Sequence, residues 1–338
     1  MKKLAYRKTW IISLICSVFI CFFLICLLEL LFMGLILRPS LSKRIGLLGI
    51  ARHLYIHTEK KLIHFDPECS QYDARLGYRL KPGQCFFENQ EYRTFYRINS
   101  LGLRDDESSL HKPQIVVLGD SFAMGWGVEQ DETFASIIEK KRHSKVLNAG
   151  IASYGTARAM RLLDQIDRRA LKYVVLQYCL NDFRENEFFH EEGLAFKTMS
   201  LQKYEETRLV YMDKRTYFFG NYFLTLIKNF SKSFIKNLHQ KNEQLNEADA
   251  FLYVLSQNKQ LLQNVQLILL ELNPFGMLRR TFIDEVKKKV ITGYSDATKN
   301  MIFIDNVDLT ADHFFLLDDH INSSGHDLIA RRILEHIE

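Results

Sequence analysis

The sequence predicts an α/β fold with a parallel sheet, preceded by one membrane-spanning helix. From Gln114 to the C-terminus, short apolar runs rich in β-favouring residues alternate with segments of helical periodicity. This alternation is typical of a parallel sheet covered by helices on both faces. Near the N-terminus, nineteen consecutive residues from Trp10 to Leu28 carry no charge. A helix of that length crosses a hydrocarbon core of about 30 Å.

We expect residues 10–37 to form an uncleaved transmembrane anchor. Apolar character resumes after Glu29 and continues to Leu37. This apolar stretch is too long for a signal peptide, and no small-residue cleavage site follows it. The basic cluster in residues 1–9 favours a cytoplasmic N-terminus, although Arg38, Lys43, Arg44 and Arg52 weaken the contrast. The remainder is then extracytoplasmic. Glu29 is expected near the outer interface without a special role, and the alternative is that it marks a partner helix.

Composition excludes some classes of function. The chain has 338 residues, of which 47% are hydrophobic and 25% are charged, as in ordinary folded proteins. The net charge is +5, and four of these charges belong to Lys2, Lys3, Arg7 and Lys8. The rest of the chain is nearly neutral, which argues against a nucleic-acid partner.

Residues 38–113 are expected to form a basic neck followed by an irregular or β-rich lead-in, because turn signals concentrate in this part. Cys69 and Cys85 lie within it and could form a disulfide in an oxidising compartment. Their spacing fits no zinc site. Cys179, at the end of a predicted strand, is expected to be a buried thiol.

Residues 114–338 are expected to form the main domain. Its predicted strands are Ile115–Leu118, Val146–Leu147, Tyr173–Tyr178, Val265–Leu270 and Met301–Ile304. Helical periodicity fills the gaps, and a closing helix, which a serine could cap, is expected near the C-terminus. Residues 186–246 break the rhythm and contain an aromatic-rich stretch. This insertion is expected to be a helical excursion packed on the domain; a lid or a second membrane-contacting surface are the alternatives.

Polar residues follow the apolar runs, at the sheet edge where ligands bind in open α/β folds. In chain order they are Gly119, Asp120 and Ser121, the turn Asn148–Thr156, Asn181 and Asp182, and finally Asp318, Asp319 and His320. A serine hydroxyl becomes a nucleophile when a histidine removes its proton and a carboxylate orients that histidine. The Ser121 N–H, an N–H of the second turn and the Asn181 amide can stabilise the resulting oxyanion.

Four stretches resemble the blocks of the SGNH, or GDSL, hydrolase family: "VVLGDSFAMG", "VLNAGIASYGT", "CLND" and "DDHINSSGH". The lead-in stretches "YDARLGYRLKPG" and "INSLGLRDDE" are similar to membrane-anchored bacterial relatives. The resemblance implies a flavodoxin-like, doubly wound sheet of five strands. It also implies metal-free and cofactor-free hydrolysis or transfer of ester-linked acyl groups, often on carbohydrates, by a domain on the periplasmic side of the bacterial inner membrane.

The chain departs from the family pattern in two places. Ser153 stands where the family has its oxyanion glycine, five residues after the asparagine of the second block. The Ser153 N–H can serve if the turn needs no positive φ, with Gly150 and Gly155 as alternatives. The family's acid commonly lies three residues before the histidine, where this chain has Leu317. Asp318 is therefore the predicted partner of His320, and Asp319 is the alternative.

The predicted function is that of a membrane-anchored serine esterase or O-acyltransferase acting on acyl, in particular acetyl, esters of an envelope glycan. Two other functions stay open: a lipase-like esterase, and a catalytically silent binding or scaffold module. The nucleophile elbow of α/β-hydrolases fits less well, because Ala123 replaces its second glycine. No phosphate-binding G-x-x-x-x-G-K motif is present. Protein partners and the oligomeric state do not follow from the sequence.

Overall fold

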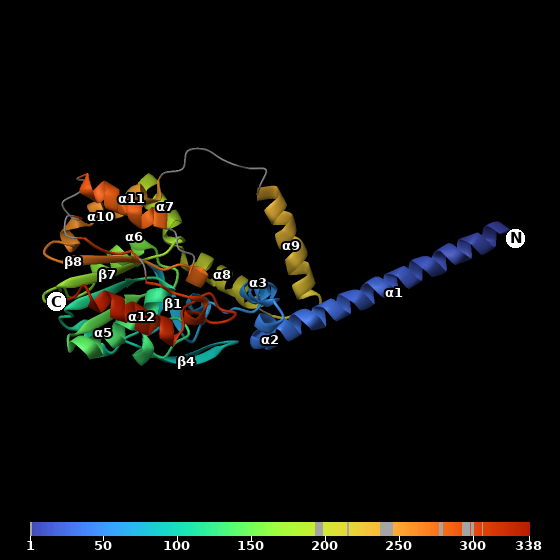
Figure 1. Ribbon diagram of the computed structural model, residues 1–338, viewed down its shortest axis with the longest axis horizontal. Coiled ribbons are helices and arrows are strands. Elements are labelled where there is room, and N and C mark those ends of the chain that lie inside the picture. The colour runs from blue at the N-terminus through green and yellow to red at the C-terminus, as the bar shows by residue number, and fades with distance from the viewer. Residues whose placement is uncertain are drawn as a thin grey trace. The chain divides into compact units, whose positions relative to one another are not determined.

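The computed structural model describes residues 2–192, 199–214, 216–236, 246–276, 280–292, 298, 301–305 and 307–338. The chain divides into two compact units. The first comprises Met1–Lys60, Met212–Asn242 and Leu316–Asp318, and the second comprises Lys61–Tyr211, Glu243–Phe315 and Asp319–Glu338. Each unit is therefore built from segments that lie far apart in the sequence (Figure 1).

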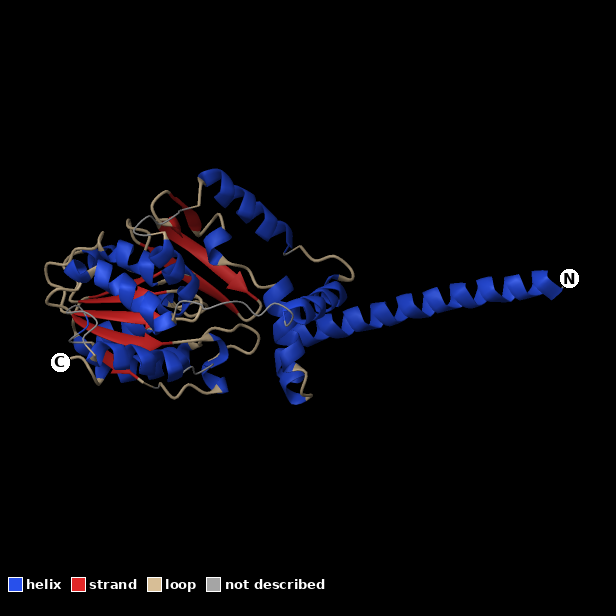
Figure 2. Ribbon diagram, turned by 90° about the horizontal axis from the view of Figure 1, so that it is seen from above, coloured by secondary structure: helices blue, strands red, loops and turns tan. Residues whose placement is uncertain are grey.

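The second unit contains the predicted five-stranded parallel sheet, whose strands are drawn in red in Figure 2. The strand order is β6-β5-β7-β8-β9, and every neighbouring pair is parallel. The strands are β5 Ile115–Gly119, β6 Val146–Gly150, β7 Tyr173–Tyr178, β8 Gln266–Glu271 and β9 Ile302–Ile304. This is the flavodoxin-like order: the first strand in the sequence, β5, lies between the second, β6, and the third, β7, so successive strands are added on opposite sides of β5. The predicted α/β fold is confirmed.

Helices cover both faces of the sheet, because successive strand residues point to opposite sides. Val116 and Leu118 of β5 pack with α6, α10 and α11, whereas Ile115 and Val117 pack with α5 and α12 (Figure 1). These helices are α5 Phe134–Arg142, α6 Thr156–Leu163, α10 Glu247–Gln257, α11 Arg280–Ile291 and α12 Ser323–Leu334. Two further helices, α4 Ser121–Met124 and α7 Asp182–Glu191, follow β5 and β7. The strands are therefore buried on both faces.

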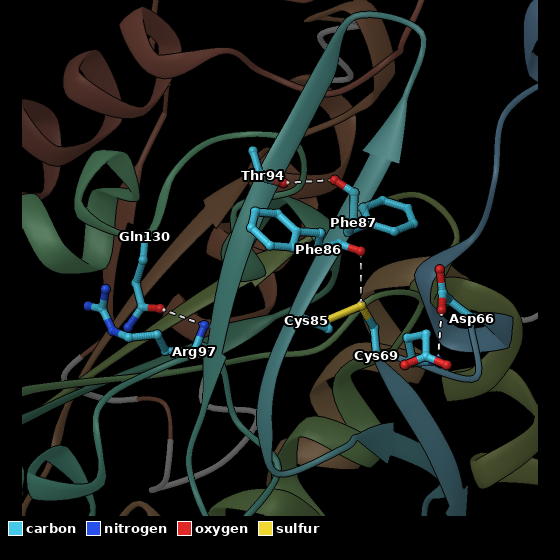
Figure 3. Close-up of a disulfide and its surroundings, with 9 residues drawn as sticks. Asp66, Cys69, Cys85, Phe86, Phe87, Thr94, Arg97 and Gln130 are labelled. Atoms are coloured by element: carbon cyan, nitrogen blue, oxygen red, sulfur yellow. Dashed lines mark hydrogen bonds between the residues drawn. A yellow bond between two sulfur atoms is a disulfide. The ribbon is translucent and has the colours of Figure 1, made fainter.

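The lead-in forms two antiparallel hairpins, so it is β-rich as predicted. One pairs β1 Ser70–Asp73 with β2 Gly77–Leu80, and the other pairs β3 Gly83–Asn89 with β4 Tyr92–Ile98. Cys69 and Cys85 form a disulfide with an S–S distance of 2.13 Å and a Cα–Cα distance of 5.5 Å (Figure 3). The disulfide links the start of the first hairpin to β3 of the second. Cys179 is a buried free thiol, as expected.

The first unit is helical. Its helices are α1 Lys2–Leu37, α2 Pro39–Arg44, α3 Leu48–Thr58 and α9 Asn221–Lys236. A small core joins them, in which Phe32 and Ile36 of α1 meet Leu54 of α3 and Tyr222 of α9. Within α1, Trp10–Leu37 is, among the described residues, the helical segment long and apolar enough to cross a membrane, and an 18-residue window of it contains no buried residue. The expected long apolar helix is present.

The aromatic-rich insertion is helical where it is described. Most of α7, all of α8 Leu201–Lys214 and all of α9 fall within residues 186–246. Residues 193–198, 215 and 237–245 of the insertion lie outside the described residues. The expectation that the whole insertion packs on the main domain is wrong for Met212–Asn242, which belongs to the first unit together with α1.

Glu29 contacts a second helix, which is the alternative named above, and the expectation that it has no special role is wrong. Its side chain is buried among α1 and α9, with 1% of the residue exposed. The carboxylate accepts hydrogen bonds from the backbone N–H groups of Tyr222 (3.1 Å) and Phe223 (3.2 Å) and from the Tyr217 hydroxyl (3.3 Å). An anionic group at a helix N-terminus satisfies otherwise unbonded N–H groups and interacts favourably with the helix dipole. Glu29 therefore fixes the start of α9 to α1.

Candidate active site

Ser121 lies just after the carboxyl end of β5, at the start of the short helix α4. The preceding Gly119 has a φ of 147°, and a Cβ there would lie 2.4 Å from the Gln177 side chain. Asp120 then caps α4, because its carboxylate accepts a hydrogen bond from the Phe122 N–H at 2.9 Å. The glycine and the cap turn the chain sharply at the strand end and hold Ser121 there.

His320 contacts Ser121 directly: its Nε2 atom lies 2.7 Å from the Ser121 Oγ. The loop that carries His320 is held by backbone hydrogen bonds, including one from the Phe315 N–H to the His320 carbonyl at 3.1 Å. The next element, α12, is capped by Asn322, whose side chain accepts from the Gly325 N–H at 3.2 Å. Asn322 therefore caps α12, where the sequence had suggested a serine. This cap holds the loop at its other end.

The two candidate carboxylates have different surroundings. The Asp319 Oδ1 atom lies 3.4 Å from the His320 Nδ1 atom, and 21% of the Asp319 side chain is exposed. Charge-assisted hydrogen bonds are usually about 2.7–2.9 Å long, so this contact is a long one. Asp318 is fully buried, and its Oδ1 atom lies 3.0 Å from the Lys60 Nζ in the first unit. Lys60 compensates the charge of this buried carboxylate.

Aromatic side chains surround His320. The Trp126 ring stacks on the imidazole with 4.7 Å between ring centroids and 11° between planes, and the Phe122 ring lies 5.0 Å away. The Trp126 indole N–H donates a hydrogen bond to the Tyr92 hydroxyl, which fixes the indole in its plane. Trp126 was not among the predicted site residues. Its position five residues after Ser121, within "GDSFAMGWGV", was the available signal.

A buried arginine supports the segment that follows α4. Arg104 is 1% exposed, and its guanidinium donates hydrogen bonds to the carbonyls of Gly125 and, at 2.5 Å, of Val128. The guanidinium also lies 3.6 Å from the centroid of the Tyr96 ring. Burial lowers the pKa of Arg104. Its hydrogen bonds hold the turn that positions Trp126, a role that no sequence motif indicated.

The backbone N–H groups expected in the oxyanion hole differ in whether they already have a hydrogen-bond acceptor. Within the described residues, the N–H groups of Ser121 and Ser153 have no hydrogen-bond acceptor. The Gly150 N–H donates to the Asn148 side chain at 3.1 Å, and the Gly155 N–H donates to Glu185 at 3.2 Å. The N–H groups of the two alternative glycines therefore already donate hydrogen bonds to side chains of the protein. Ser153 has a φ of 59°, so the turn does adopt a positive φ and the condition on which the predicted role of Ser153 depended is not met. Its N–H group nevertheless has no acceptor among the described residues.

The strand order brings the predicted donors to one edge of the sheet. Ser121 follows β5, Ser153 follows β6 and Asn181 follows β7, and β5 lies between the other two strands. The Asn181 residue is exposed and starts α7 without capping it through its side chain. At Gly150, a Cβ would lie 2.3 Å from the Met124 N atom, so only glycine lets β6 end against α4. The strand order thus places the three predicted donors after three neighbouring strands.

Two buried acids and a buried thiol lie behind this edge. Burial raises the pKa of Asp120, and the hydrogen bond from the Phe122 N–H opposes this effect only in part. Burial likewise raises the pKa of Asp182, which accepts a hydrogen bond from the Thr156 hydroxyl at 3.1 Å. The pKa of the Cys179 thiol is also raised, chiefly by burial, which keeps it unreactive. These groups are supports for the site.

Comparisons with known proteins concern the fold. No family model matches the sequence, and no curated protein matches it. Among solved structures, the chain is similar to a member of the lipolytic protein G-D-S-L family from Veillonella parvula, with 14% identity over 65% of this chain and 96% of that chain and a TM-score of 0.37.

It is also similar to the psychrotrophic esterase EstA from Pseudoalteromonas sp. (15% identity, 65% of this chain and 94% of that chain, TM-score 0.35). A third is a family two carbohydrate esterase from Clostridium thermocellum in complex with cellohexaose (12% identity, 67% of this chain and 63% of that chain, TM-score 0.38). These three structures are a member of a lipolytic protein family and two esterases.

Proposed function

We propose that this chain is a membrane-anchored serine esterase or O-acyltransferase that works through an acyl-enzyme. The observation that carries the proposal is the 2.7 Å contact between the Ser121 Oγ and the His320 Nε2 at the edge of the sheet. Beside it stand two backbone N–H groups, those of Ser121 and Ser153, with no acceptor among the described residues. A nucleophile, its base and unused donors at one edge are the parts that acyl transfer needs.

The proposed reaction begins when the Ser121 Oγ bonds to the ester carbonyl carbon while His320 takes the hydroxyl proton. The carbonyl oxygen becomes an oxyanion, which the N–H groups of Ser121 and Ser153 and the Asn181 amide stabilise, with about 3–4 kcal/mol lost on removal of one such donor. Collapse of this intermediate breaks the ester C–O bond, and His320 gives its proton to the leaving alcohol. Water or a sugar hydroxyl then attacks the acyl carbon while His320 takes its proton. Collapse of this second intermediate breaks the bond between the acyl carbon and the Ser121 Oγ, the proton passes from His320 to Oγ, and the carboxylic acid or the new sugar ester leaves.

We retain Asp318 as the carboxylate that orients His320, because it is fully buried and Lys60 keeps its charge compensated. Asp319, 3.4 Å from Nδ1, is the competing candidate. Asp318→Asn should lower kcat by about 10²–10⁴-fold, whereas Asp319→Asn should lower it by less than about 10-fold. The reverse ranking in ester hydrolysis would transfer the role to Asp319.

We also propose that α1 spans the bacterial inner membrane and that the second unit lies on its periplasmic side. The Cys69–Cys85 disulfide supports an oxidising compartment. The exposed apolar surface of Trp10–Leu37 supports a spanning helix. An anchored enzyme on that side meets acylated envelope glycans, and we propose their acyl, in particular acetyl, esters as substrates.

The first experiment uses the full chain in detergent micelles. Wild type and Ser121→Ala are compared for labelling by a fluorophosphonate probe and for release of p-nitrophenol from its acetate ester. Labelling and turnover that both vanish in the alanine variant would support the proposal. A folded wild type that neither labels nor turns over would contradict it and favour the silent binding module. Rates that increase steadily from acetate to octanoate would instead favour a lipase-like pocket.

A further inference from the structure

A group of large apolar side chains is exposed in the first unit outside α1. Phe218 and Phe219 in the turn before α9 are 54% and 51% exposed, and Leu224 and Ile227 in its first turns are 52% and 51% exposed. These four residues are called the α9 patch below. Contiguous apolar surface is uncommon on water-exposed parts of proteins and usually marks a contact with a partner or a membrane.

The α9 patch is continuous with the candidate membrane span. The Phe219 ring lies 6.3 Å, centroid to centroid, from the ring of Phe22 in the middle of the apolar part of α1. The Glu29 carboxylate accepts hydrogen bonds from the first turn of α9, so the two helices are joined at one defined point. Phe219 therefore lies at a level of α1 that is apolar and exposed, and any bilayer that covers Phe22 extends to Phe219.

The length of α1 places the membrane boundary near this junction. The apolar segment Trp10–Leu37 has 28 residues, or about 42 Å of helix, whereas the hydrocarbon core is about 30 Å thick. The surplus is at the C-terminal end, where Phe32, Leu35 and Ile36 are buried in the protein core of the first unit. The part of α1 left for lipid is thus Trp10–Leu28, and it ends beside Glu29.

Direction and charge are also those of an interfacial helix. From its junction with α1, α9 runs across the axis of α1 instead of alongside it (Figure 1). A helix that crosses a membrane span at its outer end lies along the membrane surface. From Thr216 to Lys241 the sequence contains four lysines and no acidic residue, and Lys228 is exposed beside the patch. Amphipathic helices with apolar and lysine-bearing faces bind the headgroup region of anionic bilayers.

We propose that the α9 patch inserts into the outer interface of the same bilayer that α1 crosses. Its four apolar side chains lie among the upper acyl chains, and the exposed Lys228 side chain lies at anionic headgroups. The first unit then touches the membrane with two elements, which fixes the tilt of its body over the lipid. The inference rests on the proposal that α1 is a membrane anchor, and it is independent of the ester chemistry.

The test uses the full chain reconstituted in vesicles of phosphatidylcholine and phosphatidylglycerol. A membrane-partitioning aryl diazirine is photolysed in the bilayer, and labelled peptides are quantified by mass spectrometry. The peptide Tyr217–Lys228 should be labelled at least about fivefold more than the peptide containing Phe86, a phenylalanine of the second unit that is also 51% exposed. Labelling of Tyr217–Lys228 no stronger than that of the Phe86 peptide would overturn the inference.

Matched variants sharpen the result. Leu224→Glu should reduce labelling of its peptide several-fold, because a carboxylate is expelled from the acyl region, whereas Phe86→Glu should leave labelling of the α9 peptide unchanged. A wild-type patch that is unlabelled but cross-links two copies of the chain would show that a second copy covers it, which also overturns the proposal. Absence of label on α1 itself would refute the anchor, and fluorophosphonate labelling of Ser121 in the same sample reports the esterase separately.

Discussion

Ser153 holds a backbone conformation that glycine adopts without cost. Its φ of 59° lies in the left-handed region, where a Cβ crowds the following carbonyl and costs about 1–2 kcal/mol. The Arg158 side chain holds the Ser153 carbonyl at 2.5 Å, and Arg158 is itself ion-paired with Glu185 at 2.6 Å. Strain of this kind persists where the surroundings enforce it, often in functional turns. A fixed turn keeps the Ser153 N–H pointing in one direction.

Replacing this serine by glycine should remove the strain and keep the N–H. Ser153→Gly is expected to raise the free energy of unfolding by about 1 kcal/mol while kcat for p-nitrophenyl acetate changes by less than about twofold. Ser153→Ala, which retains a Cβ, should give no stabilisation. Thermal unfolding and steady-state kinetics check both. Equal stabilisation by alanine would show that the serine hydroxyl, and not the backbone, is the source of the effect.

The stacked indole makes a second prediction for a single residue. Trp126 lies 4.7 Å from the His320 ring and restricts its rotation. Trp126→Leu should lower kcat by about 10–100-fold with little change in KM, because His320 is then less well aligned with Ser121. Trp126→Phe retains a ring on the imidazole and should lose less than about fivefold. If the leucine variant keeps wild-type kcat, the indole has only a packing role.

Elements of the main domain were largely predictable, because each strand is a run of apolar residues buried on both faces. The third predicted strand has the observed bounds, Tyr173–Tyr178, and the fifth, Met301–Ile304, starts one residue early. Helical periodicity in the sequence continues from Ala157 to Leu171, but the helix α6 ends at Leu163. After it the chain turns, and Asp167 accepts hydrogen bonds from the Lys112 and Arg169 N–H groups, a local competition that periodicity does not reveal.

Contacts between distant elements could not be predicted in the same way. Glu29 and the start of α9 are more than 190 residues apart in the sequence, and no periodicity in either segment reports the other. The same holds for Lys60 with Asp318 and for Arg104 with the turn after α4. In the site, the order of strands explained why Ser121, Ser153 and Asn181 share an edge. The stacking of Trp126 and the exact partner of each carboxylate depend on packing, which the sequence pattern does not encode.

The junction between α1 and α9 makes a prediction at the scale of elements. Glu29→Gln keeps an acceptor oxygen but removes the charge at the α9 N-terminus. Hydrogen bonds to a charged acceptor are stronger than those to a neutral acceptor by about 1–2 kcal/mol. Amide exchange of the peptide Tyr217–Lys228, measured by mass spectrometry, should therefore become about 5–10-fold faster in the variant. Glu68→Gln, which alters an exposed acid of the second unit, should leave this peptide unchanged. Unchanged exchange in Glu29→Gln would mean that packing alone fixes α9.

At the scale of the whole molecule, Asp105 makes stability depend on pH. Its carboxylate is buried beside the start of β6 and accepts hydrogen bonds from the N–H groups of Asn148 and Asp106, both at 2.7 Å. Burial raises the pKa of Asp105 to about 6. The folded state therefore binds this proton more tightly than the unfolded state, whose pKa is about 3.9. Stability due to this group falls as pH rises from about 4 to about 6 and is constant above that.

Asp105→Asn should consequently be more stable than wild type at pH 7.5, by about 1–3 kcal/mol. The difference should shrink as the pH falls from 6 toward 4, because the folded wild-type carboxyl is then protonated while the unfolded one is still largely ionised. Thermal unfolding of the full chain in detergent across this range checks the prediction. A difference that grows toward low pH would show that the Asp105 carboxylate is ionised in the folded state throughout the range.

The make-up of the first unit has a consequence for where the protein can reside. Met1–Lys60, Met212–Asn242 and Leu316–Asp318 together build one compact body, and Tyr222 and Leu317 are buried in its core beside α1 and α3. A protease that cuts the chain after the span would not release a finished soluble enzyme, because the remaining fragment would carry the apolar faces of two uncovered segments. With α1 as the membrane anchor proposed above, such cleavage is therefore a disfavoured route for releasing the second unit from the membrane.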